Sequence, residues 1–107
     1  MIPKISLRDK MEELTKPFQP LEVATANDQV VRMALIKGEY HWHKHSGEDE
    51  LFYVLSGELN IQTKDGDIIL TEGEMAVIPR GVEHCPRSDN GCYVLMIEPE
   101  GLKSEGD

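Results

Sequence analysis

Residues 43–57, HKHSGEDELFYVLSG, decide the fold and carry most of the residues with metal-binding chemistry. His43 and His45 are two positions apart, so on a β-strand both side chains would point to the same face. Glu50 follows a polar turn and opens an apolar run, residues 51–55, which is typical of a strand. We expect the turn to bring the Glu50 side chain back to the two histidines.

A third histidine, His84, comes from a separate segment that follows a Pro-Arg-Gly turn at residues 79–81. Three imidazoles and one carboxylate form a borderline-soft ligand set, suited to Zn, Fe, Mn, Ni or Cu rather than to Ca or Mg. The sequence therefore predicts a site for one divalent transition metal (Zn, Fe, Mn or Ni). Its expected ligands are His43, His45, Glu50 and His84.

From residue 29 onward, short runs of β-favouring residues alternate with turn signals. The Asp-Gly pair at residues 65–66 is a strong hairpin signal. Short strands at this spacing predict an all-β sandwich or a closed barrel. The expected strands are 30–36, 40–45, 50–55, 59–63, 68–70, 75–78, 83–87 and 93–97.

One short helix is expected ahead of the strands, over residues 6–14, with Ser6 as its N-cap. Its apolar residues fall at i, i+4 and i+7 and so form one stripe. Two prolines follow and disfavour further helix, so residues 18–23 are expected to form an extended arm. The stripe consists of Leu7, Met11 and Leu14.

Two segments resemble the two sequence motifs of the cupin superfamily. Residues 43–57 show the order His-x-His, four residues, Glu, six residues, Gly, as in the first motif. Residues 73–84 show Gly, five residues, Pro-x-Gly, two residues, His, as in the second. The fifteen residues between them match the short connection of the smallest cupins. Residues 42–55 and 94–99 extend the likeness to small single-domain bacterial cupins, often loosely labelled mannose-6-phosphate isomerase-related.

The resemblance implies a double-stranded β-helix, the cupin jelly-roll barrel, with the four ligands pointing into it. It also implies a homodimer, in which an arm such as residues 18–23 often crosses to the partner. The chain departs from the family pattern twice: Gly38 lies five residues before the first ligand rather than six, and Ser88 replaces a common asparagine. Both departures affect turn geometry and leave the ligand set intact.

We expect a single domain in three parts. Residues 1–27 would form the helix and arm, residues 28–100 the barrel, and residues 101–107 an acidic tail. The acidic residues near this end indicate a solvated, frayed segment. They are Glu98, Glu100, Glu105 and Asp107.

Three side chains are candidates for catalysis or substrate contact: His41, Tyr53 and Arg32. His41 shares strand parity with the ligand histidines, so it either faces the interior or lies half-exposed at the barrel mouth. Either Phe52 or Tyr53 lines the cavity, because neighbouring strand residues alternate. An arginine that points inward would favour an anionic substrate, and Tyr40 is a further titratable candidate.

The net charge of −9 disfavours nucleic acid and anionic membranes as partners, since both reward a basic face. No apolar stretch approaches the roughly 20 residues that span a bilayer, and the first ten residues lack an apolar signal core. The two cysteines fit a reducing compartment. We therefore expect a cytoplasmic protein whose partner is a small-molecule ligand or substrate.

Three functions are compatible with these residues. The first is Lewis-acid chemistry of an isomerase or epimerase type on a small molecule. The second is an Fe- or Mn-dependent dioxygenase, since the ligand set resembles a His/carboxylate iron site with one extra histidine. The third is a non-catalytic binding or sensor cupin. An enzyme should show an apolar cavity with a titratable group, other than a ligand, near the metal.

Overall fold

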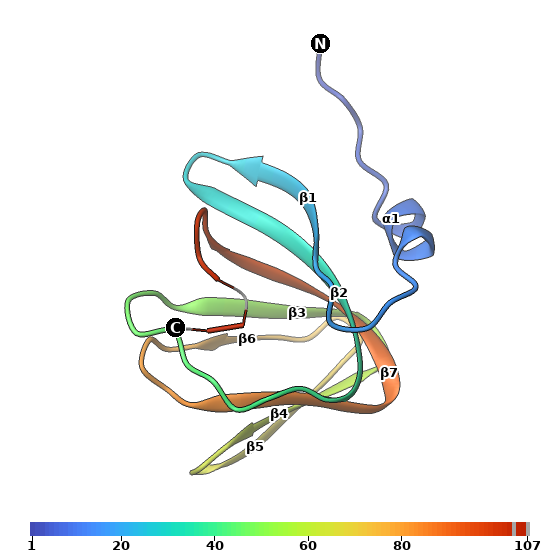
Figure 1. The fold of residues 1–107 in the computed structure, drawn as a ribbon. Helices are drawn as coiled ribbons and strands as arrows, with labels where there is room; N and C mark the ends of the chain where they lie inside the picture. The colour runs from blue at the N-terminus through green and yellow to red at the C-terminus, as the bar shows by residue number, and fades with distance from the viewer. Residues whose placement is uncertain (104, 107) are drawn as a thin grey trace.

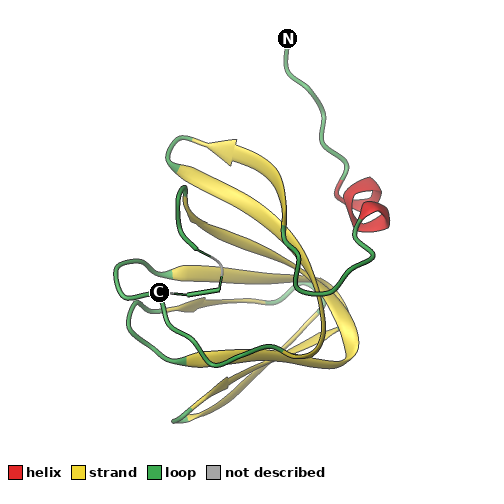
Figure 2. Ribbon diagram, in the orientation of Figure 1, coloured by secondary structure: helices red, strands yellow, loops and turns green. Residues whose placement is uncertain are grey.

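The chain folds into strands that curl around a common interior, with one short helix on the outside among the described residues (Figures 1 and 2). The computed structural model describes residues 1–103, 105 and 106. The predicted all-β fold with a short N-terminal helix is confirmed. Its elements are α1 (Leu7–Glu13), β1 (Leu21–Ala26), β2 (Gln29–Glu39), β3 (Glu50–Ser56), β4 (Glu58–Thr63), β5 (Gly66–Thr71), β6 (Met75–Ile78) and β7 (His84–Pro99).

Strand β7 is the centre of the sheet because it pairs with three other strands. It lies between β2 and β3 over much of its length and pairs with β4 near its start, always antiparallel. The sequence predicted two strands here, 83–87 and 93–97, and this was wrong. A shift of register against β2, between the pairs Ile36–Cys92 and Gly38–Ser88, bends one continuous strand. The bend lets β7 run along both β4 and β3.

Alternate residues of β2 serve two hydrophobic clusters on opposite faces of the sheet. Ala34 and Ile36 belong to the cluster that fills the barrel, whereas Met33 belongs to the one under α1. This alternation is the period of two that a strand requires. The parity of a residue therefore tells which face it occupies. The barrel cluster consists of Ala34, Ile36, Phe52, Val54, Leu59, Ile61, Leu70, Ile78, Cys92, Val94 and Met96.

Helix α1 confirms the predicted cap and stripe. The Ser6 hydroxyl accepts a hydrogen bond from the Asp9 backbone N–H at 3.2 Å. Leu14 and its stripe partners pack on the outer face of the sheet, where the Tyr93 hydroxyl donates to the Leu14 carbonyl at 3.1 Å. None of the described residues forms a helix long and apolar enough to cross a membrane.

The predicted arm is in large part a strand of this chain. β1 pairs antiparallel with β2, with Leu21 opposite Met33, so the segment joins its own sheet from residue 21 onward. The first residues of the chain extend away from the sheet in Figure 1 and leave Met1 and Ile2 exposed. The expected homodimer stays a prediction.

Replacing Gly57 by alanine should destabilise the fold strongly. A Cβ at this position would lie 2.5 Å from the Gly91 carbonyl oxygen and 2.9 Å from Cys92 Cβ, with φ at +90°. We expect Gly57→Ala to lower the free energy of unfolding by about 2–5 kcal/mol, as strain and overpacking add. The control is Gly38→Ala, where φ is +92° and the space is open; it should cost about 1–2 kcal/mol. Urea unfolding measures both, and equal losses would contradict the close approach at Gly57.

Candidate metal site

A loop, residues 40–49, joins β2 to β3 and carries two of the predicted ligands. The strand predicted at 40–45 was wrong: only His43 pairs there, in an isolated antiparallel bridge with His84. The two residues exchange backbone N–H to carbonyl hydrogen bonds of 3.0 and 2.9 Å. An alternating pattern does not reveal whether a neighbouring strand is available along the whole segment. The single bridge is enough to hold two of the four candidate ligands side by side.

The turn before β7 is tied to the same loop. Gly81 takes a φ of +80°, which glycine adopts without strain, and its N–H donates to the His45 carbonyl at 2.8 Å. Arg80 lies on the surface, where its backbone N–H donates to the Asp49 carboxylate at 2.9 Å. Arg80 therefore acts at a structural corner and does not point into the barrel.

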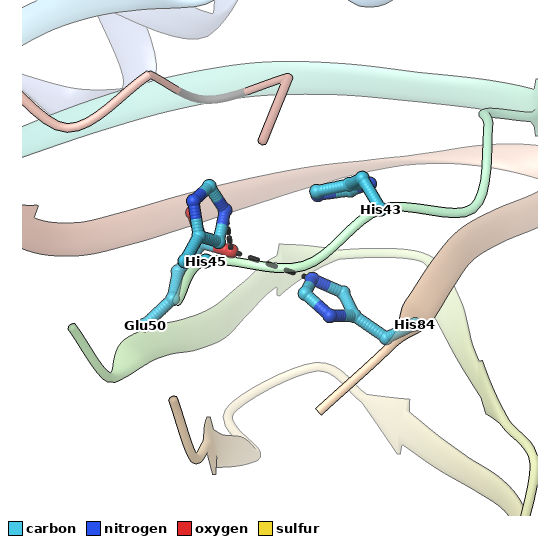
Figure 3. A group of neighbouring side chains, drawn as sticks. All are labelled: His43, His45, Glu50 and His84. Atoms are coloured by element: carbon cyan, nitrogen blue, oxygen red, sulfur yellow. Dashed lines mark ion pairs between the residues drawn. The ribbon is translucent and has the colours of Figure 1, made fainter. Parts of the chain in front are cut away.

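The four predicted ligand side chains converge inside the barrel (Figure 3). One donor atom from each of His43, His45, Glu50 and His84 lies within 4.8 Å of all the others. Glu50 Oε1 is 3.3 Å from His45 Nε2 and 3.6 Å from His84 Nε2. Three of the residues are buried, and His43 is half-buried. The group could hold a metal ion.

Backbone carbonyls fix the orientation of two of these imidazole rings. His43 Nδ1 lies 2.9 Å from the His41 carbonyl oxygen, and His84 Nδ1 lies 2.9 Å from that of Val82. Because a carbonyl oxygen only accepts, each Nδ1 must carry the hydrogen. In the neutral form of each ring the lone pair is then on Nε2, the atom that would bind a metal. Hydrogen bonds of this kind orient the histidines of metal sites.

The residues present fit a transition-metal ion. His84 Nε2 and both carboxylate oxygens of Glu50 are buried, and apart from the contacts among the candidate ligands themselves they have no hydrogen-bond partner in the described part of the chain. Leaving such groups without a partner is costly. A divalent ion that accepts imidazole and carboxylate ligands would remove this cost.

Two ligands take the protonation states that metal binding requires. Burial raises the pKa of Glu50, but contacts with His45 and His84 outweigh it and hold this pKa well below its usual range. Burial also lowers the pKa of His43. At neutral pH the carboxylate is therefore ionised and the His43 imidazole is neutral.

An apolar cavity of about 30 Å³ lies beside His43 and Glu50, which form part of its wall. Apart from these two residues and Tyr40, its lining side chains are all apolar, Phe18 and Phe52 among them. The ring of Phe18 stacks on Tyr40 with centroids 5.0 Å apart and planes inclined at 24°. This volume holds a water-sized group, so a substituent or ring edge of a larger ligand would enter it and touch aromatic surface on one side and two of the candidate metal ligands on the other.

The other candidate residues lie outside this cavity. His41 is exposed, and its ring is tilted by 34° against that of Tyr40 with the centroids 3.9 Å apart. Tyr53 packs in the cluster under α1, and its neighbour Phe52 lines the cavity. Arg32 faces the interior, yet its guanidinium is bound to Glu98 at 2.6 Å. Besides the candidate ligands His43 and Glu50, one titratable side chain lines the cavity among the described residues, that of Tyr40.

Sequence reasoning missed two residues near the site. Phe18 adopts a φ of +62°, which is rare for a bulky side chain and which no sequence signal marks. Glu98 was assigned to the solvated acidic end, but it is 0% exposed. Its parity with Val94 and Met96 along β7 would have placed it inside the barrel.

The segment after β7 folds back over the site, so the predicted frayed tail was wrong for the described residues. The carbonyl oxygens of Leu102 and Glu105 accept hydrogen bonds from Arg32 Nη1 and His41 Nε2, both at 2.9 Å. These contacts tie the chain end to β2 and to the ligand-bearing loop.

The last described residue lies directly against one candidate ligand. A Cβ at Gly106 would lie 2.7 Å from His43 Cβ, so the backbone passes closely over that histidine. Ser104 and Asp107, which the predicted tail included, lie outside the described residues.

Residues 31–98 match the family model described as Cupin domain, and the chain therefore belongs to the cupin domain family. The double-stranded β-helix inferred from the two motifs is confirmed by a solved relative. This is a cupin-2 domain containing protein from Shewanella frigidimarina, with a TM-score of 0.88 and 38% identity over 90% of this chain and 94% of that one. The mannose-6-phosphate isomerase-related label stays a prediction.

Two curated relatives extend the comparison. The chain is 40% identical to the uncharacterized protein YdbB of Bacillus subtilis over 80% of this chain and 77% of that protein. It is 34% identical to 3-hydroxyanthranilate 3,4-dioxygenase of Bos taurus over 62% of this chain. The match spans only 24% of the enzyme's length.

The stability of the metal-free protein should depend on pH through Glu98, which faces Arg32 and Glu50. Burial, and then the Glu50 carboxylate, raise the pKa of Glu98 to about 9 from an ordinary value of 4.5. The folded state then holds a proton that the unfolded state releases above its own pKa. This contribution to stability is complete below pH 4.5 and is lost as pH rises toward 9.

We therefore expect a larger fall in melting temperature from about pH 5 to about pH 8 for the metal-free wild type than for the metal-free Glu98→Gln variant. Thermal unfolding in the presence of a chelator, followed by circular dichroism, measures this difference. Parallel pH profiles for the two proteins would contradict the assignment.

Proposed function

We propose that this protein is a metal-dependent dioxygenase that acts on a small, largely apolar molecule with an aromatic ring and an oxygen substituent. One observation carries the proposal: the apolar cavity is bordered by His43 and Glu50, so the part of a molecule that enters it would lie against the metal site. The donor set supports this, because it resembles a His/carboxylate iron site with one more histidine.

Iron or manganese held by the four residues would supply electron transfer to dioxygen. Dioxygenation places both oxygen atoms in the product, so the reaction calls for no further reductant. The chain's own contribution is to position the substrate and to keep water away from it. The apolar lining, Phe18 and Phe52 included, serves the second purpose.

Tyr40 is the residue we propose to orient the substrate. Burial, and then the Glu105 and Glu50 carboxylates, raise its pKa, so its hydroxyl stays protonated at neutral pH and can donate a hydrogen bond. Phe18 stacks on the same ring and fixes the aromatic wall. A planar ring with a hydroxyl or carbonyl oxygen matches both surfaces.

A sugar or sugar phosphate fits this cavity less well. Recognition of a phosphate calls for a cation, and no arginine or lysine lines the cavity among the described residues. Isomerisation also needs a base, and the raised pKa of Tyr40 keeps its hydroxyl protonated at neutral pH, so it is not available as one. Lewis-acid isomerisation is therefore the second candidate.

The comparison with 3-hydroxyanthranilate 3,4-dioxygenase supports the proposal, since that enzyme's name denotes oxidation of an aromatic ring. The likeness covers a quarter of its length, so its substrate is not transferred to this chain.

Oxygen uptake tests the proposed reaction. Protein loaded anaerobically with Fe²⁺ should consume dioxygen with small uncharged hydroxylated aromatics such as diphenols. We expect Tyr40→Phe to lower kcat/KM by about 10–100-fold, because a hydrogen bond to the reacting substrate is lost.

The matched control is Tyr53→Phe, which removes a hydroxyl from the outer face of the sheet and should leave kcat/KM unchanged. Turnover of a sugar phosphate without oxygen uptake would overturn the proposal in favour of an isomerase. Binding of an aromatic ligand without turnover would leave a binding module.

A further inference from the structure

Three charged side chains lie in a row across the inner face of the barrel. Arg32 is on β2, Glu98 on β7 and Glu50 at the start of β3, and β7 lies between the other two strands. Each residue shares its parity with barrel-filling neighbours on its own strand, so all three point inward. Charged side chains are rarely buried in a protein interior unless they are paired with other charged or polar groups.

The contacts within the row run from Arg32 to the metal site. Arg32 Nη1 donates to Glu98 Oε1 at 2.6 Å, which fixes one oxygen of that carboxyl. The other oxygen, Glu98 Oε2, is buried and has no hydrogen-bond partner in the described part of the chain. Leu51 of β3 lies opposite Ile97 of β7 in the antiparallel pairing, so Glu50 and Glu98, the next residues on the two strands, are cross-strand neighbours on the inner face. Glu98 and Glu50 are 0% and 1% exposed, so bulk solvent does not reach either carboxyl group.

The charges in the row do not balance. One guanidinium faces two buried carboxyl groups, and Arg32 also meets the exposed Glu22 at 3.6 Å. A buried arrangement of this kind is favourable only when a further positive charge or a hydrogen lies between the carboxyl groups. A metal ion at Glu50 would supply that positive charge.

We propose that Glu98, anchored by Arg32, is a positioning residue that holds the Glu50 carboxylate toward the metal. Glu98 contacts one side of the carboxyl group and leaves the other side to the ion. Partners of a ligating carboxylate orient it and tune its affinity for the metal. The inference rests on the metal site alone and holds whatever reaction the protein performs.

Binding of Co²⁺ to the metal-free protein tests the inference, because the visible absorption of bound Co²⁺ reports its ligands. We expect Glu98→Leu to weaken Co²⁺ binding by about 10–100-fold and to change the absorption band. Glu98→Gln should restore both to near wild type, because an amide can accept from Arg32 and donate to Glu50. A structural role alone would not predict this rescue.

Two further variants complete the comparison. Arg32→Gln removes the anchor and should weaken Co²⁺ binding in the same direction, which keeps the test available if Glu98→Leu does not fold. Glu22→Gln is the matched control, since it removes the exposed carboxylate beside Arg32 and leaves the buried row intact. It should bind Co²⁺ as wild type does.

The outcomes separate the metal site from the positioning role. If wild type does not bind Co²⁺, both fail. If wild type binds and the Glu98→Leu and Arg32→Gln variants bind equally well, only the positioning role fails. If Glu98→Gln loses as much affinity as Glu98→Leu, the role of Glu98 as a hydrogen-bonded support is overturned.

Discussion

The buried carboxylate of Glu50 is the constraint on which the rest of the site depends. It is 1% exposed, and an ion that loses its water costs several kcal/mol unless other groups compensate. His45 and His84 approach one of its oxygens at 3.3 and 3.6 Å, and Glu98, bound by Arg32, is its neighbour on β7. A cation bound by these groups would complete the compensation. The barrel interior therefore holds more buried negative than positive charge, and a bound metal ion would balance it.

The barrel core supplies only part of what surrounds this carboxylate. The candidate ligands come from one loop, the start of β3 and the start of β7, which backbone hydrogen bonds hold together. The cavity wall needs Phe18 from the segment before β1, and the far side of the site is crossed by the segment after β7. Phe18, just before β1, and the segment after β7 thus flank a site that the strands between them create. This explains why an aromatic, water-poor cavity can form in so small a barrel.

The candidate ligands were predictable from the sequence because their spacing within two motifs is local. His43 and His45 were correctly grouped, although the strand proposed for them is a loop with a single bridge. The row across β2, β7 and β3 was not predictable, since it depends on which strands are neighbours.

The alternation of side chains along a strand shows which residues share a face, but it does not show which face is inside the barrel. It left Phe52 and Tyr53 as alternatives until the sheet showed which face is inside. The contacts of Leu102 and Glu105 had no sequence signal, because backbone carbonyls accept hydrogen bonds whatever side chain they carry.

Metal content is the most direct test of the account. The protein would be purified without chelator or affinity-column metal, and its metal counted by mass spectrometry alongside His84→Ala, with circular dichroism to confirm the fold. We predict close to one transition-metal ion per chain in wild type and its loss in the variant. A folded wild type without metal, or equal metal in both proteins, would contradict the central claim.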